Sequence, residues 1–313
     1  MRERIGYERL PTERANRASR ALDRLSPLEI AVLMNREDQR AVAAVGRVTR
    51  ATAAAVGLIV GALRRGGRLI FVGAGTSGRL GVLEAAECPP TFNTPPGLVQ
   101  AVMAGGRASV FRSREGAEDD ARDAARRLRA RARRGDVVVG ISASGVTPFV
   151  RAALRVARAR GCRTVLVVCH PSRSLRGVAD VLVAPAPGPE VLAGSTRLKA
   201  GTATKLVLNT LTTASMARLG KVYGNRMVDL QPRSRKLRAR AVRLVAEIAG
   251  VSRPRAGRAL AAAGGRARLA IVMARHGVDR RAGQRLLRRS GGDLRVALAR
   301  SSPRAGARPP RAV

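Results

Sequence analysis

The sequence predicts a three-layer α/β protein, with helices on both faces of a five-stranded parallel sheet, followed by a small helical region. Short, nearly continuous apolar runs recur between residues 68 and 183, and segments suited to helices separate them. Such runs are typical of strands buried on both faces, and their alternation with helices favours parallel pairing. Beyond residue 230 the apolar runs give way to short amphipathic segments.

The chain begins with a charged arm over residues 1–25 that has no sustained apolar period. Ser26-Pro27 is typical of a helix N-cap followed by proline at the first helical position, and predicts a helix through Met34. The polar stretch Asn35–Asp38 predicts an interruption. After it, the abundance of Ala and Val favours a long helix over residues 39–63.

A glycine-rich turn follows the first predicted strand, residues 68–72. Gly73–Gly78 allows a tight turn in which the backbone can approach a ligand closely. Thr76 and Ser77 add two hydroxyls at the start of a helix over Arg79–Glu87, which a proline pair is expected to end. Free backbone N–H groups and the helix dipole favour an anion there, although the same glycines would also suit an ordinary turn.

Four more apolar runs predict the remaining strands, over residues 98–103, 136–141, 163–168 and 181–183. The helices expected between them cover residues 116–134, 148–160 and 173–179. A second hydroxyl-rich turn, Ser142–Thr147, follows the third strand. Ligands of parallel sheets bind beyond the carboxyl ends of the strands, so two such turns at one edge predict a phosphate site.

A third polar loop runs from Gly188 to Lys205 and leads into an apolar helix. Ser195, Thr196, Arg197 and Lys199 place several hydrogen-bond donors next to the expected helix start. This concentration again suits an anion, but a capped helix start with solvated cations would give the same pattern.

The net charge of +39 arises from 60 Lys and Arg against 21 Asp and Glu. Basic surfaces can bind nucleic acid, but aromatic residues make up only 2% of the chain and offer little base stacking. Arginine is abundant throughout, which a compositional bias explains equally well. The composition therefore does not favour a nucleic-acid partner, although a nucleic-acid-associated regulator using the basic C-terminal region remains an alternative.

Composition also restricts the compartment and the chemistry. No run of about 20 apolar residues could span a membrane, and the N-terminus lacks the apolar region of a signal peptide, so a cytoplasmic protein is expected. Two histidines and three scattered cysteines give little material for a zinc site or a disulfide framework. Cys88 is expected to be a small buried residue rather than a nucleophile.

Acidic residues are scarce, so those near the predicted ligand edge are candidate acids and bases. Glu84 and Glu87 lie on the helix after the first turn. A second group, Glu115, Glu118, Asp119 and Asp120, opens the next predicted helix, where acids also complement the helix dipole. Spacing alone does not choose among them.

Several stretches together resemble the N-acetylmuramic acid 6-phosphate etherases, a family related to the glucokinase regulatory proteins. The matching stretches are residues 73–83, 87–91, 115–119, 143–148, 188–205, Asn209, 220–225 and 227–229. The resemblance implies a sugar-isomerase (SIS) domain, a homodimer, and no metal or redox cofactor. The implied organisation is an arm with a first helix, a sugar-phosphate-binding catalytic SIS domain, a small UBA-like helical domain and a disordered basic tail, over residues 1–38, 39–230, 231–300 and 301–313.

The reaction implied by the resemblance cleaves the lactyl ether of N-acetylmuramic acid 6-phosphate by elimination and then hydration. It implies Glu87 as the proton donor and Glu118 as the second acid, acting as base. The residues implied to hold phosphate and sugar hydroxyls are Thr76, Ser77, Ser144, Thr147, Ser195 and Lys199. Position 146 is Val where the family often has Arg, which removes one anion contact. A non-catalytic sugar-phosphate-binding regulator of the same fold is the alternative.

Overall fold

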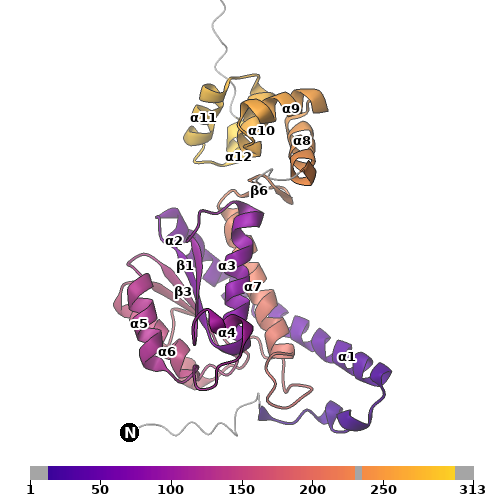
Figure 1. Cartoon of the computed structure of the whole chain (residues 1–313), viewed down its shortest axis with the longest axis vertical. Helices are drawn as coiled ribbons and strands as arrows, with labels where there is room; N and C mark the ends of the chain where they lie inside the picture. The colour runs from indigo at the N-terminus through magenta and orange to yellow at the C-terminus, as the bar shows by residue number, and fades with distance from the viewer. Residues whose placement is uncertain (1–12, 230–234, 300–313) are drawn as a thin grey trace, which may run out of the picture. The chain divides into compact units, whose positions relative to one another are not determined.

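The computed structural model describes residues 13–229 and 235–299. In this part of the chain the main sheet has five strands in the order β2-β1-β3-β4-β5, and every neighbouring pair is parallel (Figure 1). The strands are β1 (Leu69–Gly73), β2 (Val99–Met103), β3 (Val137–Ile141), β4 (Arg163–Val167) and β5 (Val181–Val183). This confirms the predicted fold class.

Helices cover both faces of the sheet. They are α5 (Ala121–Arg131) and α6 (Pro148–Ala159) on one face, and α2 (Thr49–Arg64), α3 (Gly75–Phe92) and α7 (Lys199–Arg218) on the other (Figure 1). Phe149 and Leu154 of α6 pack with Ile70 and Leu166 of the strands in one buried cluster. On the opposite face, a Cβ at Gly81 would lie 2.9 Å from the Cβ of Phe71, so α3 needs glycine there to approach the sheet.

Helix α1 (Pro27–Gly46) begins at a capping box, as the sequence predicts, but the predicted break at Asn35–Asp38 is wrong. The helix continues through this stretch because Glu37 faces the interior, where its side chain is fully buried and pairs with Lys199 at 2.5 Å. The chain turns only at Gly46 and begins α2 at Thr49. One residue of this polar stretch, Glu37, is thus buried, while Asn35 and Arg36 are exposed.

Helix α3 also departs from expectation, since it continues through Pro89 and Pro90 to Phe92. Proline fits the helical φ angle, and the pair lies in the last turns, where the missing N–H groups remove only a few main-chain hydrogen bonds. The helix ends where Asn93 adopts a left-handed φ of 50°. A proline pair near a helix end is therefore tolerated here.

Two helical segments are shorter than the sequence predicts. Helix α5 begins at Ala121, with Asp120 as its N-cap, so the preceding residues form a turn rather than the first helical turns. The link between β4 and β5 contains only a 3-10 turn, η5 (Arg173–Leu175), in place of the expected helix. The remaining short elements of this region are η3 (Arg17–Ser19), η4 (Leu22–Arg24) and α4 (Ala108–Phe111).

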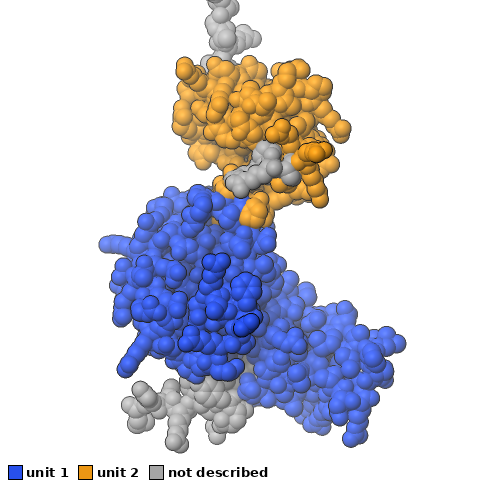
Figure 2. Space-filling model, viewed as in Figure 1, with its two compact units in different colours: residues 1–89, 94–215 blue, residues 90–93, 216–313 orange. Residues whose placement is uncertain are grey.

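The second compact unit contains residues 90–93 and the described residues from 216 onward (Figure 2). Its elements are the hairpin β6 (Val222–Tyr223) and β7 (Arg226–Met227), and the helices α8 (Arg235–Ala249), α9 (Arg253–Ala262), α10 (Ala267–His276), α11 (Arg280–Arg289) and α12 (Leu294–Ala299). The amphipathic pattern beyond residue 230 predicts four short helices, over residues 241–249, 253–262, 267–276 and 280–290. Helices α9, α10 and α11 match these closely and α8 begins six residues earlier than predicted, whereas the hairpin and α12 were not predicted. The expected boundary at residues 230–231 and the expected disordered tail at 301–313 lie outside the described residues.

A buried carboxylate joins the N-terminal arm to α1 and α7. Glu37 accepts hydrogen bonds from Lys199 at 2.5 Å and from the side chain of Asn16 at 2.8 Å. Asn16 also donates to the carbonyl of Pro189 at 3.2 Å. Burial raises the pKa of Glu37, but the hydrogen bonds from Lys199 and Asn16 lower it by more, so the carboxylate stays ionised.

Replacing Lys199 should therefore destabilise the fold, because Lys199→Met leaves the Glu37 carboxylate buried without its cation. We expect a loss of about 3–5 kcal/mol in the free energy of unfolding, measured by urea denaturation. Because the folded-state pKa of Glu37 is lowered, this contribution is present above its unfolded pKa and is lost as the pH falls through the folded value.

Arg40→Met is the matched control, since Arg40 contacts the same carboxylate at 2.7 Å but its own side chain is 56% exposed. Removing this exposed partner should cost less than about 1 kcal/mol. If Lys199→Met is no more destabilising than Arg40→Met, the buried pair does not hold these elements together.

Candidate active site

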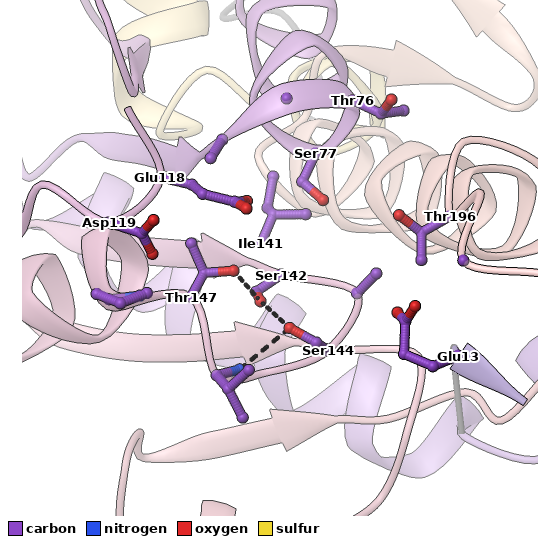
Figure 3. Close-up of a pocket in the computed structure, with 16 residues that line it drawn as sticks. Glu13, Thr76, Ser77, Glu118, Asp119, Ile141, Ser142, Ser144, Thr147 and Thr196 are labelled. Carbon is purple, nitrogen blue, oxygen red and sulfur yellow. Dashed lines mark hydrogen bonds between the residues drawn. The ribbon is translucent and has the colours of Figure 1, made fainter. Parts of the chain in front are cut away.

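The hydroxyl-rich turns that follow β1 and β3 open into one cavity of about 260 Å³ (Figure 3). Strands β1 and β3 are direct neighbours in parallel register, so both turns emerge at the same edge of the sheet. The side chains of Thr76, Ser77, Ser144 and Thr147 line this cavity. Four of the six predicted substrate-binding residues are therefore brought together, although they lie up to 71 positions apart (147 − 76) in the sequence.

The first wall of the cavity is the N-terminus of α3. The helix begins at Gly75, whose φ of 52° is left-handed, and Thr76 and Ser77 lie in its first turn. The turn is very tight, because a Cβ at Gly73 would lie 2.7 Å from the amide nitrogen of Gly78. First-turn N–H groups have no partner within a helix, so this wall offers backbone donors and hydroxyls to an anion.

The second wall is a turn that its own hydroxyls hold in shape. The hydroxyls of Ser142 and Thr147 lie 2.8 Å apart, and the Gly145 amide donates to the Ser142 hydroxyl at 3.0 Å. The Val146 amide donates to the Ser144 hydroxyl at 3.3 Å. Helix α6 then begins at Pro148. Ser142, Ser144 and Thr147 all line the cavity, but Ser142 is only 3% exposed and mainly supports the turn.

Glu118 belongs to a turn between α4 and α5, and its side chain lines the cavity. Its backbone carbonyl accepts a hydrogen bond from the amide of Phe149 at 2.9 Å, which ties this turn to the start of α6. Partial removal from water, and then the negative charges of Asp119 and Glu115, raise the pKa of the Glu118 carboxyl above its usual range. A carboxyl with a raised pKa exchanges protons more readily near neutral pH.

The geometry separates Glu118 from Glu115, which the residue pattern alone could not do. Glu118 and Asp119 line the main cavity, whereas Glu115 lines only an adjoining cavity of about 170 Å³. Glu118 lines both cavities. Of the residues proposed as a base, it is the one with access to a ligand held by the two turns.

The lining of the main cavity contains no Lys or Arg among the residues that the structure describes. Val146 is part of the lining, and so are the acidic side chains of Glu13, Glu118 and Asp119. An anionic group here would be held by hydroxyls, backbone N–H groups and helix dipoles. The described lining thus lacks basic side chains although the net charge of the chain is +39.

Two predicted ligands do not line the cavity. Ser195 lies between Gly194 and Thr196, and it is these two neighbours that reach the lining. Lys199 is 1% exposed and its ammonium pairs with Glu37, so the structure gives it a role in the interior rather than on a ligand. The expectation that Lys199 contacts an anionic ligand is therefore corrected.

Glu87 is also placed differently from expectation. It is exposed in the C-terminal half of α3, at a rise of about 1.5 Å per residue roughly 18 Å along the helix from Gly75. It therefore does not flank the cavity of its own chain. The other acid of this helix, Glu84, is buried and accepts hydrogen bonds from Lys205 and, at 2.6 Å, from Thr212 of α7.

Cys88 is buried as expected, with 2% of its surface exposed. Burial, and then the charge of Glu84, raise the pKa of its thiol to about 12. The thiol is therefore not a nucleophile at neutral pH.

Glu13 and Thr196 line the cavity but were not among the predicted site residues. Thr196 belongs to a loop whose concentration of donors was visible in the sequence. Glu13 had no local signal, because Asn16 fixes its segment through contacts with Glu37 and Pro189, far away in the chain.

A protein-family model and a solved structure are both similar to parts of this chain. The glucokinase regulatory protein N-terminal SIS domain matches residues 51–158. A phosphoheptose isomerase from Neisseria gonorrhoeae superposes with a TM-score of 0.49 at 20% identity, over 61% of this chain and all of its own.

Two sequence relatives are both named N-acetylmuramic acid 6-phosphate etherase. The protein from Synechocystis sp. is 49% identical over 92% of this chain and 95% of its own length. The protein from Symbiobacterium thermophilum is 53% identical over 86% of this chain and 90% of its own. With similarity of this extent, the chain belongs to the N-acetylmuramic acid 6-phosphate etherase family.

Proposed function

We propose that this chain is a carbon–oxygen lyase that cleaves the lactyl ether of N-acetylmuramic acid 6-phosphate. The products are N-acetylglucosamine 6-phosphate and D-lactate, as in amino-sugar catabolism and peptidoglycan recycling. The observation that carries this proposal is identity of about 50% to etherases over most of the chain. The hydroxyl-lined cavity at two helix N-termini supports it, because such a site suits a phosphate ester.

The proposed chemistry is an elimination followed by addition of water. A base removes the proton on carbon 2 of the open-chain sugar, and the lactate oxygen leaves carbon 3 with a proton from an acid. Water then adds at carbon 3, so the overall reaction consumes one water molecule. Two carboxyl groups in different protonation states suit these steps, because one accepts a proton while the other donates one.

We assign the base to Glu118 and the proton donor to Glu87. The position of Glu118 at the cavity and its raised pKa support the first assignment. We assign the phosphate and sugar hydroxyls to Thr76, Ser77, Ser144 and Thr147, with Ser195 acting through the shape of its loop. Lys199 would contribute indirectly, by holding Glu37 and the start of α7.

The exposed position of Glu87, roughly 18 Å along α3 from Gly75, requires a further element. We propose that the chain forms a homodimer in which Glu87 of one subunit completes the cavity of the other. A symmetric dimer would present this exposed stretch of α3 to an identical partner. One active site would then combine Glu118 of one subunit with Glu87 of the second.

We also propose that the enzyme works in the cytoplasm. Cys88, Cys162 and Cys169 are all unpaired and buried, which is the usual state in a reducing compartment. None of the described helices is by itself long and apolar enough to cross a membrane, although α1 and α2 pass that test together as a pair bent by 61°.

Mixing two inactive variants tests both the activity and the shared site. Wild-type protein should release D-lactate from the substrate. The substitutions Glu87→Gln and Glu118→Gln should each lower the turnover rate by about 10²- to 10⁴-fold. Co-expressed with different tags, the two variants form mixed dimers with one intact site each. A random mixture should recover about a quarter of the wild-type activity.

Each outcome of this experiment is informative. No recovery in isolated mixed dimers would contradict the shared site and would require Glu87 to act within its own chain or not at all. If wild-type protein releases no D-lactate while the substrate still raises its melting temperature, the chain is a sugar-phosphate-binding regulator instead.

The raised pKa of Glu118 predicts a change in the pH profile. If Glu118 is the base, kcat/KM falls as the pH drops through its pKa, and Asp119→Asn removes one of the negative charges that raise that pKa. The ionised base is then stabilised, so the acidic limb should move to lower pH. Asp23→Asn, a change of the same kind outside the cavity, should leave the limb in place. A limb that stays or moves upward in Asp119→Asn would contradict the assignment.

A further inference from the structure

The N-terminal arm contributes a carboxylate to the cavity. Glu13 is part of the lining, and its side chain lies near Thr196 and Ser144, across the cavity from Glu118 and Asp119 (Figure 3). The cavity therefore carries negative charge at two opposite sides, with the hydroxyls between them. The proposed chemistry uses the charge on the Glu118 side and leaves Glu13 without a role.

Asn16 anchors the segment of the arm that carries Glu13. Asn16, only 8% exposed, donates from its side chain to Glu37 at 2.8 Å and to the carbonyl of Pro189 at 3.2 Å. The side-chain oxygen of Asn16 accepts a hydrogen bond from the amide of Ala18 at 3.0 Å, which caps the short helix η3. The segment is thus anchored to the interior three residues after Glu13.

The neighbouring loop leaves room for this carboxylate at Gly194. A Cβ at Gly194 would lie 3.0 Å from the Oε2 of Glu13, and the φ of Gly194 is a left-handed 77°. A side chain there would be strained and would press on the carboxylate. Gly194 and Thr196 both line the cavity, so the arm and the loop together form one of its walls.

The charge of Glu13 restricts what it can bind. An ionised carboxylate accepts hydrogen bonds and repels anions. The proposed substrate has a phosphate and a lactyl carboxylate, which are both anionic, and also sugar hydroxyls and an acetamido N–H, which are neutral donors. Glu13 would therefore attract the neutral donors and keep both anionic ends of the substrate away from this wall.

We propose that Glu13 is a substrate-positioning residue that accepts hydrogen bonds from neutral O–H or N–H groups of the sugar. By holding the sugar on the side of the arm, it directs the phosphate to the N-termini of α3 and α6. This inference rests on the proposed function, because it assumes a sugar phosphate in the cavity. It assigns the arm a part in substrate recognition, where the sequence showed only charge.

Binding of two ligands by the same variants tests the proposal. N-acetylglucosamine 6-phosphate, the product, carries the sugar donors, whereas inorganic phosphate carries none of them. Glu13→Ala and Glu13→Gln should weaken binding of the product, measured by calorimetry, by about tenfold or more. Binding of inorganic phosphate, measured by competition with the product, should be unchanged or tighter, because a like charge has been removed.

Further variants separate positioning from structural damage. Glu13→Asp keeps the charge and should retain more product affinity than Glu13→Ala. Asp23→Asn removes a carboxylate from the same arm outside the cavity and should bind both ligands as the wild type does. In turnover assays, KM should rise in Glu13→Gln by a larger factor than kcat falls.

The outcomes distinguish this inference from the proposed function. Product binding by Glu13→Ala at wild-type strength would overturn the role of Glu13 and leave the etherase proposal intact. Equal weakening of product and phosphate would mean that Glu13 only supports the fold, and would also overturn the inference. Wild-type protein that neither binds the product nor releases D-lactate would overturn the proposed function, and the inference with it.

Discussion

The parallel pairing of β1 with β3 is the constraint on which the site depends. Because these neighbouring strands run in the same direction, the turns after Gly73 and Ile141 must emerge side by side. Each turn leads into the N-terminus of a helix, α3 or α6, so the hydroxyls and free N–H groups of both converge on one cavity. The lining needs no cation to receive a phosphate, which fits the absence of Lys and Arg from it in the described structure.

A second constraint acts through Glu37. Its buried carboxylate is in contact with Asn16 of the arm and Lys199 of α7, two segments that are far apart in the sequence. An ionised group in the interior is stable only while its partners remain in place, so the arm and the polar loop are positioned together. Lys199, which the sequence suggested as a substrate ligand, thus stabilises the fold instead. The anchored arm in turn brings Glu13 to the cavity.

The sequence predicted the features that depend on local pattern. All five strands and the two hydroxyl-rich turns were expected, because the buried strands are mostly apolar and Gly, Ser and Thr mark the turns. The break in α1 was misplaced because polarity at Glu37 does not reveal whether a side chain faces water or a buried partner. Glu13 was missed for a related reason, since its position is set by three-dimensional packing that no local spacing encodes. Glu87 was misplaced although the rise of its own helix sets it roughly 18 Å from Gly75.

We propose that Glu118 removes the proton on carbon 2 of the bound sugar. Incubating N-acetylglucosamine 6-phosphate with the protein in heavy water tests this directly, because removal and return of that proton introduce deuterium at carbon 2. We expect incorporation with the wild type and its loss in Glu118→Gln protein that still binds the product. Undiminished incorporation in Glu118→Gln would contradict the account and move the base to another carboxylate, with Glu115 the first to test.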